Sequence, residues 1–413
     1  MSTAPWRTDR WFSSPWNYLP EVVEGFTFPE SLEIHDVTLR DGEQQAGIEF
    51  TTDDKVRIAE LLAEAGVHRI EAGLPAVSRA DEKAVREIVR LGLPSKIYAF
   101  SRCMLDDVKR AVDCGVSGVV LEIPASHHLI ERAYRWPVEK AMELSIEATS
   151  FAHENGLKVS FFPIDATRAG AVELLDDLSR VAREGHVDAV GLVDTFGVIS
   201  PHAIGYFVKQ VRNRLNVPLE THFHMDFGLG VANTVIAVTL GASCIQTTIA
   251  GLGERAGNTP MEETVLALLT MYGLDTGVRT ERFFPMAREV LERARVAQPS
   301  NRPVIGERLF NVESGIIASW VKNVGSENLT EAFPFRPELV GQTGPEIVLG
   351  KGSGLDSVLI WLDRLEKGPA SEEQMLAILT EVKALSLQKK GLLTDDDFVN
   401  IADGVLAGAG AAV

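Results

Sequence analysis

The stretch Leu219-Glu-Thr-His-Phe-His-Met-Asp226 begins with a short run of apolar and β-branched residues that is typical of a strand. A glycine-rich turn follows, and residues 230–240 then carry apolar side chains at helical spacing. The same strand–turn–helix unit recurs eight times between residues 32 and 269. The strands are predicted at Leu32–Thr38, Arg69–Ala72, Lys96–Ser101, Gly118–Ile123, Lys158–Phe162, Ala189–Val193, Leu219–Phe223 and Cys244–Ile249. The helices are predicted at 53–65, 79–91, 105–114, 138–155, 171–184, 201–213, 230–240 and 261–269.

Eight such units predict an α/β fold, a (β/α)8 TIM barrel. An open, doubly wound sheet is the alternative, but polar residues gather at the strand C-terminal ends, where a barrel has its active face. No G-x-G-x-x-G motif follows the first strand, so a dinucleotide site has no support. We expect an aromatic N-terminal arm at 1–30 and the barrel at 31–275. A small, irregular linker subdomain at 276–354 and a short helical C-terminal subdomain at 355–413 follow.

Composition excludes several classes of protein. The 413 residues are 45% hydrophobic and 24% charged, as in ordinary globular proteins, and no apolar run is long enough to cross a membrane. The net charge of −18 disfavours a nucleic-acid or anionic-membrane partner. The three cysteines have no C-x-x-C spacing, and the N-terminus has no apolar signal segment. We therefore expect a cytoplasmic protein without disulfides.

The two histidines of the quoted stretch, His222 and His224, are one residue apart. Side chains at i and i+2 of a strand point to the same face, so both imidazoles converge if this segment is a strand. Such convergence is what a divalent metal needs, and imidazole is a common metal ligand. The alternative is a pair of histidines packed in the core.

Neighbouring strands supply further polar groups. Strand one ends in Arg40 and Asp41, and strand eight runs into Gly251-Leu-Gly-Glu-Arg-Ala-Gly-Asn258. In a closed barrel, strands seven, eight and one are adjacent, so Asp41, both histidines and Asn258 can reach one metal. Imidazole, carboxylate and amide ligands suit Mg²⁺, Mn²⁺ or Zn²⁺ and do not decide among them.

Several motifs together resemble the isopropylmalate/homocitrate synthase family, which belongs to the DRE-TIM metallolyases. They are Leu39-Arg-Asp-Gly-Glu-Gln44, Thr221-His-Phe-His224 with Asp226 and Gly228, and the Gly251–Asn258 loop. Supporting motifs are Ile70-Glu-Ala-Gly-Leu-Pro75, Asp165-Ala-Thr-Arg168, Val193-Asp-Thr-Phe-Gly197, Glu313-Ser-Gly-Ile316 and Val348-Leu-Gly-Lys351. The resemblance covers about residues 31–355. The motifs together are specific for the family, and no single motif would be.

The resemblance implies a divalent-metal-dependent Claisen condensation of acetyl-CoA, as co-substrate, with a 2-oxo acid, as in homocitrate, isopropylmalate and citramalate synthases. It implies that Asp41, His222 and His224 bind the metal, with Asn258 as a weaker ligand. It further implies that Arg40 stabilises the developing oxyanion and that Thr195 and Arg168 contact the oxo acid. It also implies that Glu254 and Arg255, in the loop near the acyl-CoA end, are catalytic residues with less defined roles. A homodimer is expected, and no extra amino-acid feedback domain.

Three positions depart from the family pattern. Ile317 stands where the family has a histidine after Glu-Ser-Gly-Ile, and the segment 330–335 offers no tyrosine, so the usual proton relay is missing or replaced. Ile164 replaces a carboxylate before Asp165, and Met225 replaces an asparagine. These departures leave two alternatives open: a metal-dependent aldolase or lyase on the same barrel, and a non-catalytic homologue.

Overall fold

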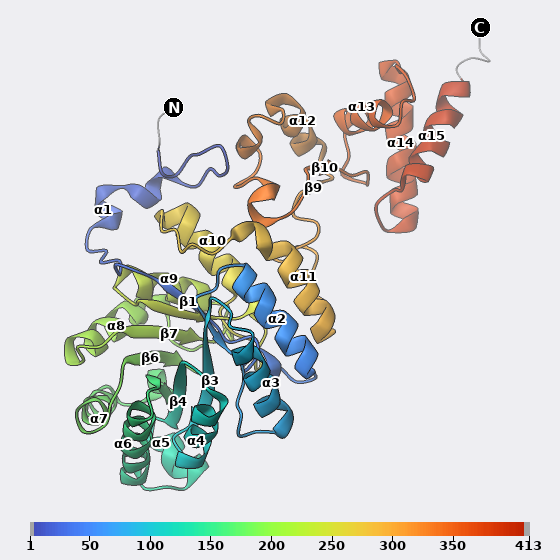
Figure 1. The fold of residues 1–413 in the computed structure, drawn as a ribbon. Coiled ribbons are helices and arrows are strands. Elements are labelled where there is room, and N and C mark those ends of the chain that lie inside the picture. Colours follow the sequence, from blue (N-terminus) through green and yellow to red (C-terminus); the bar gives the residue numbers. More distant parts are fainter. Residues whose placement is uncertain (1–3, 409–413) are drawn as a thin grey trace. The chain divides into compact units, whose positions relative to one another are not determined.

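A computed structural model describes residues 4–408, and its main feature is a closed barrel of eight parallel strands (Figure 1). The strands are β1 (Glu33–Asp36), β2 (Arg69–Glu71), β3 (Lys96–Arg102), β4 (Gly118–Pro124), β5 (Lys158–Ile164), β6 (Ala189–Asp194), β7 (Leu219–Phe223) and β8 (Cys244–Thr247). The predicted TIM barrel is confirmed, and the open sheet is excluded because β1 pairs with β8.

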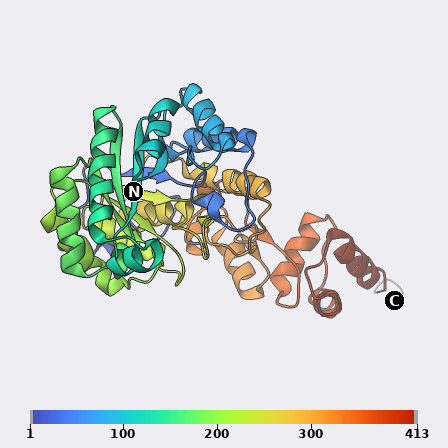
Figure 2. The same ribbon diagram turned by 90° about the horizontal axis from the view of Figure 1, so that it is seen from below.

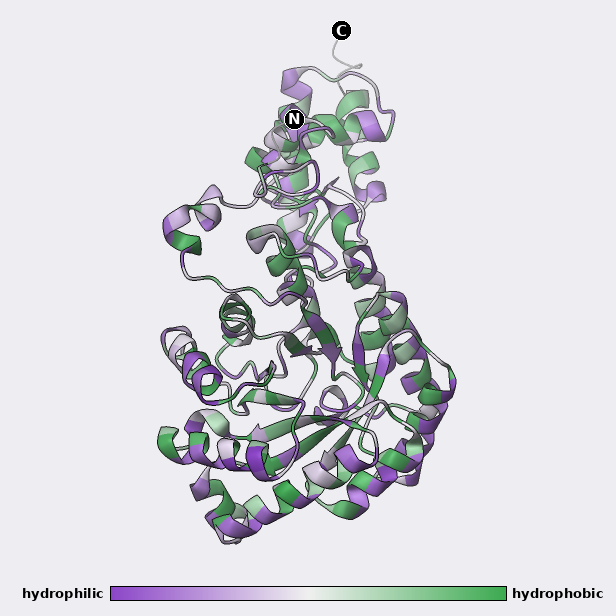
Figure 3. Cartoon of the chain, turned by 60° about the vertical axis from the view of Figure 1, so that its left-hand side comes forward, coloured by the Kyte–Doolittle hydropathy of each residue, from purple (hydrophilic) through white to green (hydrophobic). Residues whose placement is uncertain are grey.

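Helices follow the strands in the predicted order and lie outside them (Figures 1 and 2). They are α2 (Thr52–Glu64), α3 (Arg79–Arg90), α4 (Leu105–Cys114), α6 (Val138–Glu154), α7 (Ala171–Glu184), α8 (Pro201–Arg214), α9 (Gly230–Thr239) and α10 (Met261–Tyr272). Most carry hydrophilic and hydrophobic residues on the same helix (Figure 3), as expected where one face packs on the strands. A local signal fixes the start of α2, where Thr51 and Asp54 form a capping box.

The closure of the barrel sets the positions of the candidate ligands. In the register of β1 and β8, Asp36 pairs with Thr247, and β7 pairs with β8 through Glu220 and Cys244. The C-terminal ends of β7, β8 and β1 are therefore neighbours, as the sequence predicted.

The chain folds into two compact units, Pro15–Gln298 and Met1–Ser14 with Pro299–Val413. The first contains the barrel, short α1 (Pro20–Val23), short α5 (His127–Leu129) with the π-helical turn Ile130–Tyr134, and α11 (Phe283–Ala294). The second contains β9 (Asn311–Val312), α12 (Gly315–Val324), β10 (Glu346–Ile347), α13 (Leu355–Arg364), α14 (Glu372–Lys389) and α15 (Asp395–Gly408).

The second unit has its own hydrophobic core, in which Trp361 and Phe398 contact edge to face. The linker subdomain predicted at 276–354 contains α12, a helix of ten residues that was not predicted. Its neighbouring glycines and β-branched Ile316 and Ile317 weaken the helix signal, and packing of Ala318 and Ile317 on the core overrides it.

The N-terminal segment divides between the units. Phe12 donates a backbone hydrogen bond to Pro334, and Trp11 forms an isolated bridge with Phe335, so residues 4–14 belong to the second unit. Residues 1–3 of the predicted arm and 409–413 of the predicted helical subdomain lie outside the described residues. The division into arm, barrel, linker and helical subdomain stays our proposal. Within 4–408 no helix is both long and apolar enough for a membrane span.

Candidate active site

The two histidines and the aspartate meet at the C-terminal end of the barrel. His222 Nε2 lies 3.3 Å from His224 Nε2 and 3.5 Å from Asp41 Oδ2, and His224 Nε2 lies 4.0 Å from the same oxygen. A metal about 2.1 Å from each of two ligands separates them by roughly 3.0–3.5 Å. All three side chains are buried. The two shorter separations match this range, and the third, 4.0 Å, stays below the roughly 4.2 Å between ligands on opposite sides of such an ion, so the donor set can hold one divalent cation.

Asn258 completes this group from the loop after β8. Its Nδ2 donates to Asp41 Oδ1 at 2.8 Å, and its Oδ1 is buried without a hydrogen-bond partner among the described residues. Glycine is required beside it: Gly253 has φ +152°, and a Cβ there would collide with the Asn258 side chain. The loop thus brings an amide to the aspartate and leaves one oxygen available.

A hydrogen-bond chain behind His222 fixes its orientation. Glu220 accepts from Arg69 Nη1 at 2.6 Å and from Ser160 Oγ at 2.7 Å, and Gln246 Nε2 donates to it at 3.4 Å. The other end of the Gln246 amide, Oε1, then faces His222 Nδ1 at 2.9 Å. His222 must carry its proton on Nδ1, which leaves the Nε2 lone pair directed at Asp41 and His224.

The protonation states suit metal binding. Burial lowers the pKa of His222 to about 3 and also lowers the pKa of His224, so both imidazoles are neutral near pH 7. Burial disfavours the charge on Asp41, but the Arg40 guanidinium, the two histidines and the hydrogen bond from Asn258 together outweigh burial and hold the pKa of Asp41 well below its usual range. Two neutral imidazoles and one carboxylate are the ligand forms a divalent metal takes.

Arg40 places a buried positive charge beside this group. Its Nη1 donates to Asp41 Oδ2 at 2.7 Å, its Nε donates to Glu71, and its guanidinium lies 4.1 Å from the centroid of the Phe100 ring. Arg40 Nη2 is buried and has no hydrogen-bond partner in the described part of the chain. A substrate oxygen in the adjoining cavity can satisfy it. Glu71 lies in a motif that the sequence singled out, but no role was predicted for it.

These residues line a cavity of about 160 Å³. The lining residues are Arg40, Asp41, Gln44, Phe100, Glu122, Phe162, Ile164, Thr195, His222, His224 and Glu254. The volume equals that of roughly five water molecules, which suits a small acid. Sequence reasoning missed Phe100, Glu122 and Phe162, because inward-facing residues of barrel strands cannot be told from other strand residues by composition. Gln44 belongs to the Leu39–Gln44 motif, but no role was predicted for it.

The remaining predicted residues divide into two groups. Thr195 and Glu254 line the cavity, and Thr195 Oγ1 also accepts from the backbone N–H of Asp165. Arg168 and Arg255 do not line it. Arg168 donates to both carboxylate oxygens of Asp165 and lies over Phe196 at 3.8 Å, and it is partly exposed.

Arg255 joins two loops at the barrel mouth. It donates to both carboxylate oxygens of Asp226 and to the backbone carbonyl of Thr195. Because Thr195 itself lines the cavity, Arg255 supports that loop from behind.

Comparison with known proteins agrees with this geometry. The profile of the HMGL-like family matches residues 31–290. The chain belongs to the HMGL-like family. It is 38% identical to homocitrate synthase AksA of Methanopyrus kandleri over 95% of this chain and 97% of that protein. It is 34% identical to 2-isopropylmalate synthase of Methanocaldococcus jannaschii over 94% of this chain and 74% of that protein.

A solved structure shows the fold alone. Hydroxymethylglutaryl-CoA lyase from Pseudomonas aeruginosa aligns with a TM-score of 0.56 at 21% identity, over 64% of this chain and 93% of that one. This similarity confirms the barrel architecture for this HMGL-like protein. At 21% identity the similarity supports no conclusion about the activity of this chain.

The three departures have defined surroundings in this HMGL-like chain. Ile164 lines the cavity, so the wall is apolar at the position where the family pattern has a carboxylate. Ile317 packs against the core of the second unit. Met225 donates its backbone N–H to Gly257 at 2.9 Å, which fixes the loop that carries Asn258.

Another buried group of possible ligands is the cluster His35, Glu220 and Cys244. Glu220 there is already neutralised by Arg69, and burial raises the pKa of the Cys244 thiol well above its usual value. The cluster lines no part of the cavity that holds Arg40, and we assign it to the barrel core.

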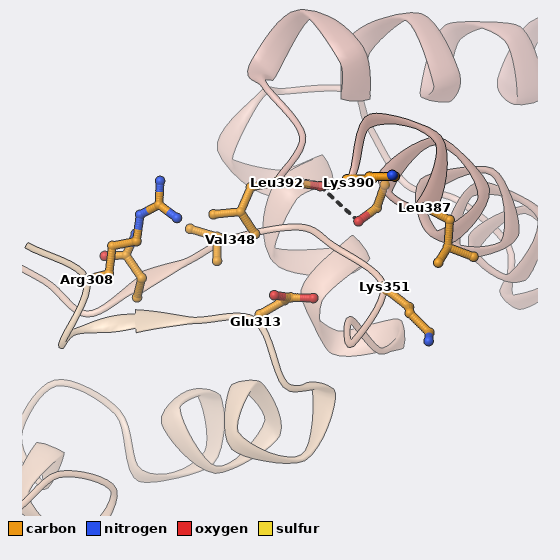
Figure 4. A pocket seen from close by; sticks show the side chains of 10 residues that line it. Arg308, Glu313, Val348, Lys351, Leu387, Lys390 and Leu392 are labelled. Atoms are coloured by element: carbon orange, nitrogen blue, oxygen red, sulfur yellow. Dashed lines mark hydrogen bonds between the residues drawn. The ribbon is translucent and has the colours of Figure 1, made fainter. Parts of the chain in front are cut away.

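A larger cavity of about 490 Å³ lies within the second unit (Figure 4). Exposed Arg308, Lys351 and Lys390 border it, with Glu313 among them. The Glu313 carboxylate accepts the backbone N–H of Gly352 at 2.9 Å and so occupies the loop where an anion would bind. This cavity therefore lacks the convergent chemistry of the barrel site.

Proposed function

We propose that this chain is an acyl-CoA:2-oxo-acid C-acyltransferase that condenses acetyl-CoA with a small 2-oxo acid. The observation that carries the proposal is the convergence of Asp41, His222, His224 and Arg40 on one buried cavity. The names of relatives that match nearly the whole chain support condensation, since they are homocitrate and isopropylmalate synthases. They favour condensation over cleavage and over a non-catalytic role.

The metal site is part of this proposal. Asp41, His222 and His224 would hold one Mg²⁺, Mn²⁺ or Zn²⁺ ion, with Asn258 as a further ligand through its free Oδ1. Such an ion supplies a Lewis acid that polarises a carbonyl and neutralises negative charge. Gln246 keeps the Nε2 lone pair of His222 directed at the site.

The other lining residues bind and orient the oxo acid. Arg40 Nη2 donates to the oxygen on which charge develops, and Glu71 holds the guanidinium in place. The Thr195 hydroxyl donates to the carboxylate. Phe100, Phe162 and Ile164 form the apolar wall, so a short apolar side chain fits better than a charged one.

Acetyl-CoA is the proposed co-substrate, and we assign Glu254, which lines the cavity, to the end that would receive its thioester. Arg168 and Arg255 support the site without lining it. Arg168 holds Asp165, and Arg255 holds the loop of Thr195. We also propose a cytoplasmic homodimer, on the basis of the cysteine content and the family resemblance. Neither nucleic acid nor membrane is a proposed partner.

Release of free thiol tests the proposal. The protein with acetyl-CoA, Mg²⁺ or Mn²⁺ and a panel of 2-oxo acids should release CoA with at least one of them. Removing the metal with a chelator, or the substitution Asp41→Asn, should abolish the release while the protein stays folded by circular dichroism. Absence of thiol release with every acid would refute the proposal. Formation of carbonyl products from hydroxy diacids without CoA would favour the lyase alternative instead.

A further inference from the structure

The condensation needs a base that removes a methyl proton from acetyl-CoA, and the usual relay is not available. Ile317 cannot accept a proton, and it packs into a hydrophobic core. The titratable side chains that line the cavity are Arg40, Asp41, Glu122, His222, His224 and Glu254. Arg40 stays protonated, and Asp41 and the two histidines are the proposed metal ligands. Glu122 and Glu254 remain.

Glu254 is poorly suited to the task. Its side chain is 55% exposed, and it pairs with Arg255 at 3.5 Å. A carboxylate in contact with water does not have the raised basicity that burial gives, because solvent screens its charge and competes for the proton.

Glu122 has the position that Glu254 lacks. It lies near the end of β4, paired in register with Arg102 of β3 and Phe162 of β5. Val120, two residues earlier, belongs to the buried cluster with Phe100 and Phe162, so the strand period points Glu122 to the same, inner face. Its side chain lines the cavity with Arg40.

The groups facing Glu122 come from several elements. They are Arg40 after β1, Arg102 of β3, Cys103 after β3, Asp107 of α4 and Tyr134 of the π-helical turn. Burial raises the pKa of Glu122 above its usual value, against the opposing effect of Arg40 and Arg102. The Tyr134 hydroxyl lies 3.5 Å from Glu122 Oε1. A carboxylate of raised basicity beside a fixed cation is a typical general base.

We propose that Glu122 is the general base of this chain and takes the methyl proton of acetyl-CoA. The proposal rests on the condensation function given above. The Glu122 carboxylate gains the proton, and the C–H electron pair forms the new bond to the keto carbon of the oxo acid. The keto oxygen receives the displaced π electrons and then, through solvent, the proton that Glu122 had gained, which restores the Glu122 carboxylate. Water attacks the thioester carbonyl, and CoA leaves as the thiol.

The substitution Glu122→Gln tests the assignment in the full-length protein. Glu143→Gln is the matched control, because Glu143 is an exposed glutamate of α6. E122Q should lower kcat by about 10² to 10⁴-fold, and E143Q should leave it unchanged. E122D should recover part of the loss, and added formate should partly rescue Glu122→Ala. The affinity for Mn²⁺ should stay at the wild-type value in E122Q.

Two readouts distinguish proton transfer from a structural role. In the wild type kcat/KM should fall as the pH drops below the pKa of Glu122, and E122Q should lose this limb. The kinetic isotope effect with acetyl-CoA deuterated at the methyl group should increase in E122D. Wild-type kcat in E122Q, or loss of the acid limb in Glu254→Gln instead, would overturn the assignment. An inactive wild type would refute the condensation function itself, so the two failures are distinguishable.

Discussion

The substitution Gln246→Leu removes the amide that fixes His222 while leaving all proposed metal ligands in place. Leucine fills nearly the same volume, but it accepts no hydrogen bond from His222 Nδ1 and donates no hydrogen bond to Glu220. The imidazole can then place its proton on Nε2, the atom that faces Asp41. Loss of such a supporting partner typically weakens metal affinity 10- to 100-fold. This corresponds to about 1.4–2.8 kcal/mol of binding free energy.

The assay is titration of metal-free protein with Mn²⁺, with free Mn²⁺ followed by electron paramagnetic resonance. Gln342→Leu is the matched control, because Gln342 is a buried glutamine of the second unit whose Nε2 donates to Val304 at 2.9 Å. Both variants should lose stability, since each leaves a buried group unpaired at a cost of about 1–3 kcal/mol. Only the Gln246 variant should bind Mn²⁺ more weakly. A folded Gln246→Leu protein with wild-type affinity would refute the proposed role of the chain behind His222.

Three further predictions concern other residues. Because burial depresses the pKa of His222 to about 3, native protein binds fewer protons than unfolded protein between pH 3 and 6.5. When the pH drops from 6 to 5, the free energy of unfolding of metal-free wild type should therefore fall by about 1 kcal/mol more than that of His222→Asn, as measured by urea unfolding. An equal fall in both proteins would contradict this. In Arg40→Lys the single ammonium cannot reproduce the guanidinium hydrogen bonds to both Glu71 and Asp41, so kcat should fall about 10²- to 10³-fold in steady-state assays. A loss below tenfold would show that the guanidinium group is dispensable. Ile317→Ala should cost about 1–3 kcal/mol in thermal unfolding with kcat within about twofold of wild type, and an inactive but stable variant would place Ile317 in the reaction.

Much of the site followed from two rules of strand geometry. The i, i+2 spacing of His222 and His224 predicted their convergence, and the adjacency of first and last strands in a closed barrel predicted their meeting with Asp41. Both are consequences of backbone geometry, which the order of elements along the chain already determines.

The residues that support these groups could not be predicted in the same way. Glu71 and Gln246 bond to side chains that come from the neighbouring strand, and Glu122 of β4 shares a cavity with Arg40, which follows β1. Which of these side chains meet depends on the tilt and register of the strands. A carboxylate in a strand is as consistent with a surface ion pair as with a cavity wall. The same limit affected Arg168 and Arg255, whose motifs give no indication that Asp165 and Asp226 hold them outside the cavity.

The most direct test of the proposed reaction is the fate of the two acetyl carbons. The protein is incubated with acetyl-CoA labelled with ¹³C at both acetyl positions, a divalent metal and the 2-oxo acid that gives thiol release, and the product is analysed by mass spectrometry. The account predicts a hydroxy diacid that contains both labelled carbons and forms only when the metal is present. Labelled acetate as the only product, with the oxo acid recovered unchanged, would contradict it.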